Sequence, residues 1–353
     1  MLPRSLIVAM LCAAAVTAEF VGGKATRDAL FLTALGPAAL PAMLVVTALT
    51  SIALVAAYVR VSHCINPARL VPLSFVGSGV LFLLEWAVRS AWPEATAVVV
   101  YLHVSGAGPL LASGFWLIAS ERFDPSTAKA RFGQIAGAGT FGGLLGALLS
   151  ERVAATIGAP PMLLFLGALQ FIAAYLVAML ARKRVRVDNS ALSSRPGPAV
   201  KCGVRAATEA PHLRDLMALV LLGTTSAALL EYLFKVRAVE TLGSGDALLR
   251  FFAVYYAFTS LTSFVLQVAG SGAVLERFGL ALTTSAPSIA VLAGSVASLV
   301  APGFGGLVVA RASESILRGS WFRAGYELFF TPLPVEEKRI AKPVIDVGLD
   351  RLG

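Results

Sequence analysis

Long apolar runs, separated by short charged segments, repeat along almost the whole chain and constrain its fold more than any single motif does. A helix needs about 20 apolar residues to cross the hydrocarbon core of a bilayer, and the sequence supplies such runs repeatedly. Hydrophobic residues make up 57% of the chain and charged residues 14%, whereas about a quarter of the residues in soluble domains are charged. One soluble core could not bury that much apolar surface. The sequence therefore predicts an all-α polytopic membrane protein.

Ten of the apolar runs are predicted to be membrane spans. The first has an alternative interpretation, because Arg4, an apolar run and the small residues at Val16-Thr17-Ala18 are typical of a signal peptide with its cleavage site. A repeat described below continues from this run, which favours a span. The predicted spans lie near residues 5–22, 38–59, 69–88, 95–119, 133–155, 160–181, 213–235, 247–270, 279–300 and 302–319.

One long linker, residues 182–212, divides the chain into two halves. It is rich in Arg, Lys, Ser and Pro, which is typical of a solvated connector. We therefore expect an N-terminal half of six helices at 1–181, and a C-terminal half of four helices and a cytoplasmic amphipathic tail at 213–353. Most of the 29 Lys and Arg residues fall in the tails and in the loops on the side of the N-terminus. The positive-inside rule then places both ends in the cytoplasm, and the charge of +9 needs no nucleic-acid partner.

The two halves share an internal repeat. The segments that begin at Glu121 and at Glu327 each contain a Glu, a Phe two residues later, then a Pro and a basic cluster. Two six-helix halves related by duplication are the plan of major-facilitator transporters. We therefore predict a major-facilitator-like bundle of six plus six helices.

The ends of the first and seventh predicted spans also correspond. Glu19 and Lys24 close the first, and Glu231 and Lys235 close the seventh. The sequence ends at Gly353, where the repeat would begin an eleventh span. The expectation is therefore a second half that lacks its last two helices.

Ionisable residues within or beside spans are costly and are often functional. Lys24, Arg27 and Asp28 follow the first apolar run in the string GGKATRDALFL. One interpretation is a cationic site for an anionic substrate at the mouth of a cavity. The other is an interfacial basic cluster whose side chains reach the lipid headgroups. The sequence leaves both open.

A second charged cluster closes the seventh span in the string EYLFK. Glu231 and Lys235 are four residues apart, so they share a helix face and can pair. The pair is interpreted as a gating or coupling pair that opens when substrate competes for the lysine. The alternative is a structural ion pair. Tyr232 and Phe234 lie beside the pair in the same string.

Three further features are given structural interpretations. Glu85 and Arg89 are interpreted as a solvated pair, and His103 as a satisfied core histidine rather than a proton relay. The glycines of span 133–155 form small-xxx-small steps at 139/143 and 142/146, which predict close helix packing. No Gly-Lys-Ser/Thr follows them, so a phosphate-binding loop is not expected. These glycines are Gly137, Gly139, Gly142, Gly143 and Gly146.

The sequence contains no arrangement typical of an enzyme. Cys12, Cys64 and Cys202 have no metal-like spacing, and no Ser/His/Asp or Cys/His set or catalytic carboxylate pair stands out. We therefore expect no catalytic activity, no metal and no cofactor.

Four strings resemble the ATP/ADP carrier (nucleotide transporter) family of plastids and intracellular bacteria. The chain is more similar still to that family's free-living bacterial relatives, which are often fused to HEAT-repeat or cyclic-nucleotide-binding domains. The resemblance covers essentially the whole chain. The strings are KATRDALFL from Lys24, FWLIASERFDPSTAKARFG from Phe115, EYLFK from Glu231 and YELFFTPLPVEEKRIAKPVIDVGLDRLG from Tyr326.

The resemblance implies a carrier in a bacterial inner membrane that exchanges an organic anion such as ATP or ADP by alternating access. Lys24, Glu231 and Lys342 match positions on which exchange depends in the family. A fourth position is a Glu in the relatives, where this chain has Ser105 in the string YLHVS. This departure supports an alternative function, a non-transporting membrane anchor or sensor that serves a soluble regulatory domain.

Overall fold

The computed structural model describes residues 4–122, 125–182, 211–300, 303–322 and 326, and every regular element in these ranges is a helix. The predicted linker at 182–212 lies almost entirely outside the described residues. The helices are α1 (Arg4–Leu35), η1 (Pro37–Ala39), α2 (Leu40–Cys64), α3 (Pro67–Val88), α4 (Pro93–Leu102), η2 (His103–Ala107), α5 (Gly108–Arg122), α6 (Pro125–Thr156), α7 (Met162–Ala181), α9 (Pro211–Leu242), α10 (Asp246–Val300), α11 (Phe304–Leu317) and η4 (Arg318–Phe322).

Most of the predicted spans are confirmed as long apolar helices. Eight helical segments in the described residues are long and apolar enough to cross a membrane. The two remaining predictions, 133–155 and 302–319, fall on α6 and on α11 with η4. Glycines lower the hydropathy of α6, and α11 alone has 14 residues.

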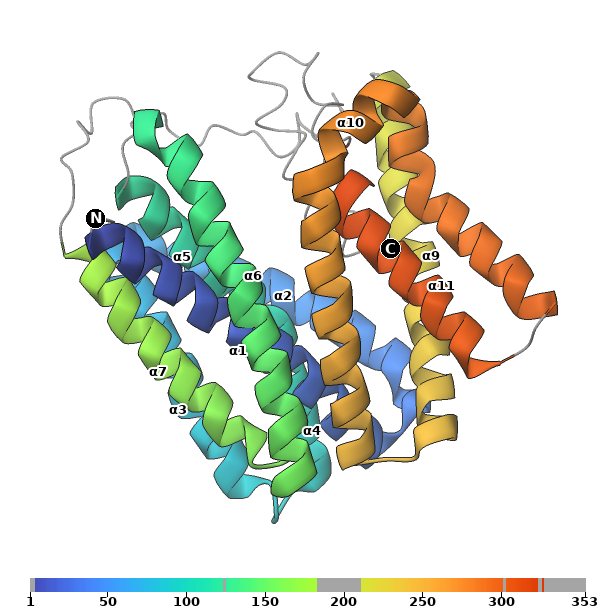
Figure 1. Ribbon diagram of the computed structural model, residues 1–353. Coiled ribbons are helices and arrows are strands. Elements are labelled where there is room, and N and C mark those ends of the chain that lie inside the picture. The colour runs from blue at the N-terminus through green and yellow to red at the C-terminus, as the bar shows by residue number, and fades with distance from the viewer. Residues whose placement is uncertain (1–3, 123–124, 183–210, 301–302, 323–325, 327–353) are drawn as a thin grey trace. The chain divides into compact units, whose positions relative to one another are not determined.

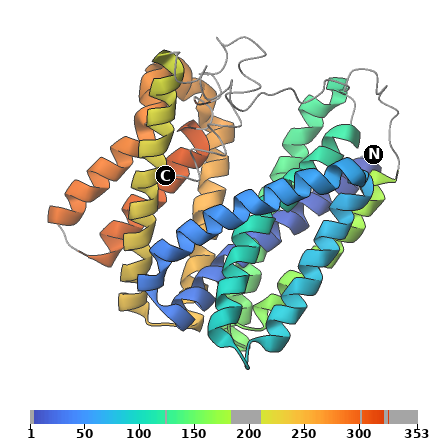
Figure 2. The same ribbon diagram turned by 180° about the vertical axis from the view of Figure 1, so that it is seen from behind.

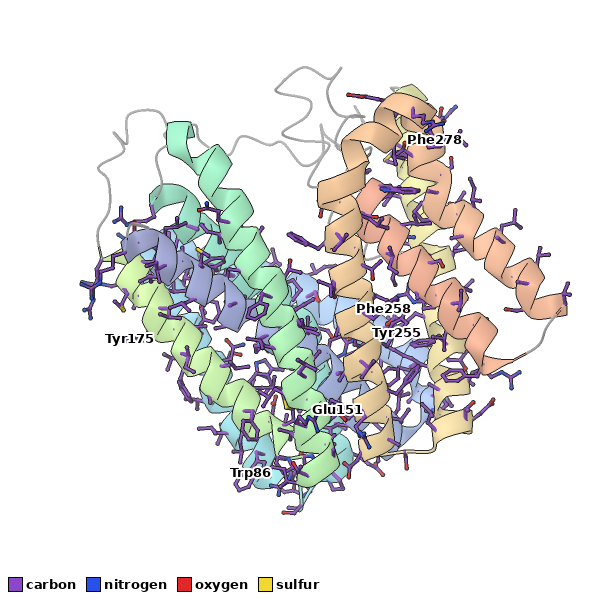
Figure 3. All side chains as sticks on the ribbon, in the orientation of Figure 1. Trp86, Glu151, Tyr175, Tyr255, Phe258 and Phe278 are labelled. Carbon is purple, nitrogen blue, oxygen red and sulfur yellow. The ribbon has the colours of Figure 1, made fainter. Side chains whose placement is uncertain are left out.

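Large apolar side chains on the outside of the helices fit a lipid environment. Val45 and Leu49 of α2 are 62% and 64% exposed, and Leu84 of α3 is 55% exposed. Tyr175 points away from the bundle on the outer face of α7 and is 64% exposed (Figure 3). A water-soluble protein rarely exposes so many contiguous apolar groups. The chain is a multi-pass membrane protein.

The chain forms two compact units. Unit 1 comprises residues 1–187 together with 242–258, and unit 2 comprises 188–241 and 259–353. The start of α10 joins unit 1 through polar contacts. The Asp246 carboxylate accepts a hydrogen bond from the Ala159 amide at 2.6 Å, and Arg250 pairs with Glu151 at 2.9 Å. Figure 3 labels Glu151 on α6.

Helix α1 is the central helix of unit 1 and extends well beyond the predicted span of 5–22. It runs from Arg4 to Leu35, so Lys24, Arg27 and Asp28 lie inside the helix rather than at its end. The prediction was wrong because these charged residues were taken for a boundary. Their side chains are satisfied by other helices, so the helix can continue past them.

Helices α1 and α6 approach closely along a glycine stripe, and they lie side by side in both views (Figures 1 and 2). A Cβ atom on Gly142 would overlap the backbone of Ala14, and one on Gly146 would overlap the backbone of Ala18. Only glycine allows this approach, because any larger residue would push the helices apart. The predicted packing role of these glycines is confirmed.

The predicted span 95–119 contains a π-helical turn, η2 at His103–Ala107, between α4 and α5. Pro109 has no backbone N–H to donate to the carbonyl of Ser105 four residues earlier, which favours a widened turn here. Such turns occur frequently at functional sites. This turn places His103 and Ser105 inside unit 1.

Unit 2 is built around α11 and η4. Ser263 of α10 donates a hydrogen bond to the carbonyl of Ile316 at 3.4 Å, and Gly294 packs against Ala310. Helix α10 is broken at Gly279, whose φ of 73° lies in the left-handed region that glycine tolerates. The break separates the two spans predicted at 247–270 and 279–300.

Candidate functional site

Lys24 of α1 lies against an aromatic ring within unit 1. Its Nζ atom is 4.2 Å from the centroid of the Tyr256 ring, a cation–π contact. The Tyr256 hydroxyl donates a hydrogen bond to Asp28 Oδ2 at 2.5 Å. Tyr256 is 6% exposed and Asp28 is 1% exposed. The start of α10 therefore closes over this part of α1 and fixes the aromatic ring that contacts the ammonium group.

Arg27 connects α1 to the π-helical turn. Its guanidinium pairs with Asp28 at 2.9 Å and donates a hydrogen bond from Nη1 to Ser105 Oγ at 2.7 Å. It also lies over the Tyr101 ring, 4.6 Å from the centroid. The Arg27 side chain is 11% exposed, so it does not reach out to lipid headgroups. The alternative of an interfacial basic cluster is therefore wrong for this residue.

These contacts bring together three predicted site residues, Lys24, Arg27 and Ser105. We call this group, with Tyr101 and Tyr256, the α1 cation site. Aromatic faces and a hydroxyl stabilise the cations, and Asp28 supplies a carboxylate to Arg27 at 2.9 Å. Lys24, Arg27 and Asp28 together carry two positive charges and one negative charge, so their net charge is positive and suits an anion.

Unit 2 contains a second charged cluster, built on the predicted pair. Lys235 Nζ lies 2.9 Å from Glu231 Oε1, as the spacing of four residues predicted. Arg311 of α11 pairs with Glu231 at 2.8 Å and also with Glu314. Arg318 donates to Glu314 at 2.5 Å. We call these five residues the unit 2 ion network.

Glu231 and Lys235 were predicted from the sequence as a pair, but Arg311, Glu314 and Arg318 were not predicted. A signal was present, because these residues recur at spacings of three and four and would share one helix face. Glu314 is fully buried and Lys235 is 2% exposed. Charges buried this deeply need partners, and the network supplies them.

Two other predicted site residues are not assigned to either cluster. Tyr232 is half-buried on α9, next to Glu231. Lys342 lies outside the described residues. Phe234, the second predicted aromatic, is buried and stacks on Phe304 at 6.3 Å between ring centroids, which assigns it a packing role.

A third polar cluster lies inside unit 1. His103 Nδ1 is 3.0 Å from Glu85 Oε1, and His103 Nε2 is 2.8 Å from Ser78 Oγ. The expected solvated pair of Glu85 with Arg89 is wrong, because Glu85 is 3% exposed and Arg89 instead donates to the carbonyl of Trp86. The prediction of a satisfied core histidine is borne out by these two hydrogen bonds. We call Ser78, Glu85 and His103 the His103 cluster.

No group of three or more His, Cys, Asp and Glu side chains in the described part of the chain could hold a metal ion. Cys12 is buried in the core of unit 1 among apolar residues of α1 and α7. Its thiol points to the Ala173 carbonyl at 3.9 Å.

Comparison with known proteins identifies the fold. The chain is similar to the crystal structure of the nucleoside transporter NupG, with a TM-score of 0.72 and 11% identity over 99% of this chain and 88% of that one. It is also similar to the POT family transporter PepTSo, with a TM-score of 0.65 and 12% identity over 100% and 88% of the two chains. For a D-xylose-proton symporter the TM-score is 0.58 and the identity 14%, over 98% and 87%.

These likenesses establish the predicted all-α, major-facilitator-like fold. No protein-family model matches the sequence, and no curated protein matches it either. The finer resemblance to ATP/ADP carriers stays a prediction.

Proposed function

We propose that the chain is a transporter of the major-facilitator type that carries a small organic anion by alternating access. The observation that carries this proposal is the α1 cation site, where Lys24 and Arg27 lie inside the bundle against aromatic rings. A cation within a membrane protein is energetically costly, so such residues usually have a function. The likeness of fold to transporters of nucleosides, peptides and xylose supports transport as the activity.

The proposed substrate class is a phosphorylated anion, with a nucleotide such as ATP or ADP as the first candidate. Lys24 supplies a point charge for a phosphate oxygen, and Arg27 supplies a planar donor that can bind two oxygens at once. Tyr232, which is half-buried on α9, is proposed to offer an aromatic face on which a base can stack. The resemblance of the strings KATRDALFL and EYLFK to nucleotide carriers supports the same class.

The pair of Glu231 and Lys235 is proposed to act as a gate. Its ion pair neutralises both groups in the empty state, which avoids an unpaired buried charge. An anionic substrate that approaches Lys235 competes with Glu231, and the released carboxylate retains Arg311 as a partner at 2.8 Å. Lys342 is proposed as a further substrate-binding cation.

Orientation and location follow from the same proposal. Both ends of the chain are proposed to lie in the cytoplasm, because most of the Lys and Arg residues would then be on that side. The membrane is proposed to be a bacterial inner membrane. The halves at 1–181 and 213–353, joined by the linker at 182–212, are proposed to rock against each other during transport.

An anchor or sensor that does not transport is the second candidate function. Ser105 supports it, because the family resemblance places a carboxylate at this position and the hydroxyl instead accepts a hydrogen bond from Arg27. Such a protein would bind an anion at the α1 cation site without moving it across the bilayer.

Uptake by the purified chain in proteoliposomes tests the proposal. The panel includes labelled ATP, ADP, other phosphorylated anions and an uncharged nucleoside. We expect saturable uptake of at least one phosphorylated anion, and its loss in Glu231→Ala. The matched control is Arg237→Ala, which removes a cation from an exposed pair with Glu240 on the same helix. Anion binding without uptake would favour the sensor, and neither binding nor uptake would overturn the proposal.

A further inference from the structure

We propose that a pocket at one end of unit 1 binds the phosphate group of an anionic phospholipid, a role that goes beyond the proposed transport and does not depend on it. The pocket has a volume of about 420 Å³ and lies where α1 begins and where α5 and α7 end. Each of these three helices contributes one arginine to its lining, at or next to the helix terminus: Arg4, Arg122 and Arg182. Figures 1 and 2 both show the start of α1 beside the end of α7.

The three helix ends that form the pocket emerge on one side of the membrane. Helix α1 is the first span, α4 and α5 form the fourth, and α7 is the sixth. Because successive spans run in opposite directions, the start of the first and the ends of the fourth and sixth lie on the same side. Arginine side chains at the ends of spans reach the level of the lipid headgroups. The pocket therefore lies where a phospholipid presents its phosphate.

The three arginines are available to a ligand. Arg4 and Arg182 are exposed, and Arg122 is half-buried. Within the part of the chain that the structure describes, none of the three is held in an ion pair. The exposed Arg237 of α9, by contrast, pairs with Glu240 at 2.8 Å. The pocket thus brings together three guanidinium groups that the described carboxylates do not occupy.

The sequence around the pocket arginines adds further positive charge. Arg182 is followed by two basic residues, at 183 and 184, whereas acidic residues stand at 121 and 124 on the two sides of Arg122. The three arginines and these neighbours carry five positive and two negative charges, a net charge of +3. A local excess of this sign attracts anions, and anionic lipids most strongly where it lies at the membrane surface.

The polar part of the lining matches the chemistry of a phosphate group. A guanidinium is planar and can donate to two phosphate oxygens at once. Three of them that come from separate helices can surround one phosphate from different directions. Ser5 of α1 also lines the pocket, and its hydroxyl is a further donor for a phosphate oxygen or for the glycerol of a headgroup.

The apolar part of the lining favours a lipid over a free phosphate. Val8, Met179 and Leu180 line the same pocket. A free phosphate gains nothing from apolar walls, whereas the acyl carbons next to a lipid headgroup are stabilised by contact with them. One turn further into the membrane, Leu11 follows Val8 on α1 and Tyr175 precedes Met179 on α7, and they are 55% and 64% exposed. Their side chains offer a surface along which the acyl chains can continue.

Native mass spectrometry of the full chain, purified in detergent and freed of bound lipid, tests the site. The probes are phosphatidylglycerol, whose headgroup is anionic, and phosphatidylcholine with the same acyl chains and no net charge. We expect the first phosphatidylglycerol to bind at least about tenfold more tightly than phosphatidylcholine, because each arginine near an anionic headgroup contributes about fivefold. Equal binding of the two lipids overturns the proposal.

Single substitutions locate the binding in the pocket. Arg4→Gln, Arg122→Gln and Arg182→Gln should each weaken phosphatidylglycerol binding by about fivefold and leave phosphatidylcholine binding unchanged. The matched control is Arg69→Gln. Arg69 is an exposed arginine at the start of α3, on the same side of the membrane, and does not line the pocket. If Arg69→Gln weakens binding as much as the three pocket variants do, the lipid follows the basic surface in general and the proposal is wrong.

A variant that keeps every charge tests the cavity itself. Ser5→Phe places a ring in the pocket, so the preference for phosphatidylglycerol should fall as it does in the arginine variants. An unchanged preference contradicts binding inside the pocket. Thermal unfolding in detergent shows that each variant retains its fold, and the arginine series decides the matter by itself if Ser5→Phe does not fold.

Inorganic phosphate distinguishes a lipid from a free anion. Added at the concentration of the lipid, it should not displace phosphatidylglycerol, because it makes no contact with the apolar part of the lining. Displacement at that concentration would identify a free phosphate as the ligand and overturn the lipid as its source. None of these measurements involves transport, so the failure of the uptake experiment and the failure of the lipid site are separate results.

Discussion

The two units hold their buried cations by different means. In unit 1, Lys24 lies against the Tyr256 ring, and Arg27 contacts the Tyr101 ring and the Ser105 hydroxyl as well as Asp28. In unit 2, Lys235, Arg311 and Arg318 each contact a carboxylate of Glu231 or Glu314. The α1 cation site therefore combines two rings and a hydroxyl with one carboxylate, whereas every cation of the unit 2 ion network contacts a carboxylate.

This difference suggests that the α1 cation site binds substrate and that the unit 2 ion network stabilises the fold. A contact with an aromatic face stabilises a cation by about 0.5–2 kcal/mol but does not neutralise its charge. A carboxylate compensates the charge itself, and removing one member of such a pair is costly. We therefore expect substitutions in the unit 2 ion network to affect stability most, and those in the α1 cation site to affect anion binding.

The largest loss of stability is expected for Glu314→Gln. This change leaves Arg311 and Arg318 without the carboxylate that both contact, and the free energy of unfolding should fall by about 3–5 kcal/mol. Thermal unfolding of the purified protein in detergent measures the effect. Glu240→Gln is the control, because Glu240 is in an exposed pair and should change stability by less than about 0.5 kcal/mol. Equal effects of the two changes would contradict the account.

A smaller loss is expected for Asp28→Asn. The amide oxygen can still accept from Tyr256, and Arg27 keeps its contacts with Ser105 and Tyr101. The lost charge should cost about 1.5–3 kcal/mol, the range for hydrogen bonds to charged groups. The same unfolding assay measures it. A loss as large as that of Glu314→Gln would show that unit 1 depends on formal charges as much as unit 2 does.

Two variants of Tyr256 separate the contribution of its ring from that of its hydroxyl. Tyr256→Leu removes the ring that Lys24 contacts, so anion half-saturation should change by a few-fold, in line with about 0.5–2 kcal/mol for a cation–π contact. Tyr256→Phe keeps the ring, so its half-saturation should stay within about twofold of the wild type, with a stability loss of about 1.5–3 kcal/mol from the missing hydrogen bond to the charged Asp28. If both variants bind alike, the ring has no part in the site.

The smallest effect is expected for Ser105→Ala. Arg27 loses one hydrogen-bond acceptor but retains Asp28 at 2.9 Å, so stability should fall by about 1 kcal/mol or less. Comparison with Asp28→Asn in the same unfolding assay shows whether Asp28 or Ser105 contributes more to stability. A larger loss for Ser105→Ala would reverse that ranking.

The sequence was sufficient to predict the helices and the fold class, because apolar runs of membrane length have few other uses. It was also sufficient for contacts between neighbours on one helix, such as Glu231 with Lys235. The small-xxx-small steps correctly predicted close helix packing at Gly142 and Gly146, although they did not identify α1 as the partner helix.

Contacts between residues far apart in the sequence were not predictable. Glu85 was assigned to Arg89, its neighbour at helical spacing, but its partner is His103 on another helix. The end of α1 was placed too early for the same reason. Charges at Lys24 and Arg27 end a helix only if nothing satisfies them, and Tyr256, the ring against Lys24, is more than 200 residues away.

The most direct test of the central claim is the uptake of phosphorylated anions by Lys24→Gln in proteoliposomes, beside Lys24→Arg and the exposed control Arg237→Ala. The account predicts that Lys24→Gln raises the half-saturation concentration by about tenfold or more, as expected for the loss of one charge-assisted contact. Lys24→Arg should retain part of the affinity, and Arg237→Ala should match the wild type. Undiminished uptake by Lys24→Gln would contradict the claim that the α1 cation site binds the substrate.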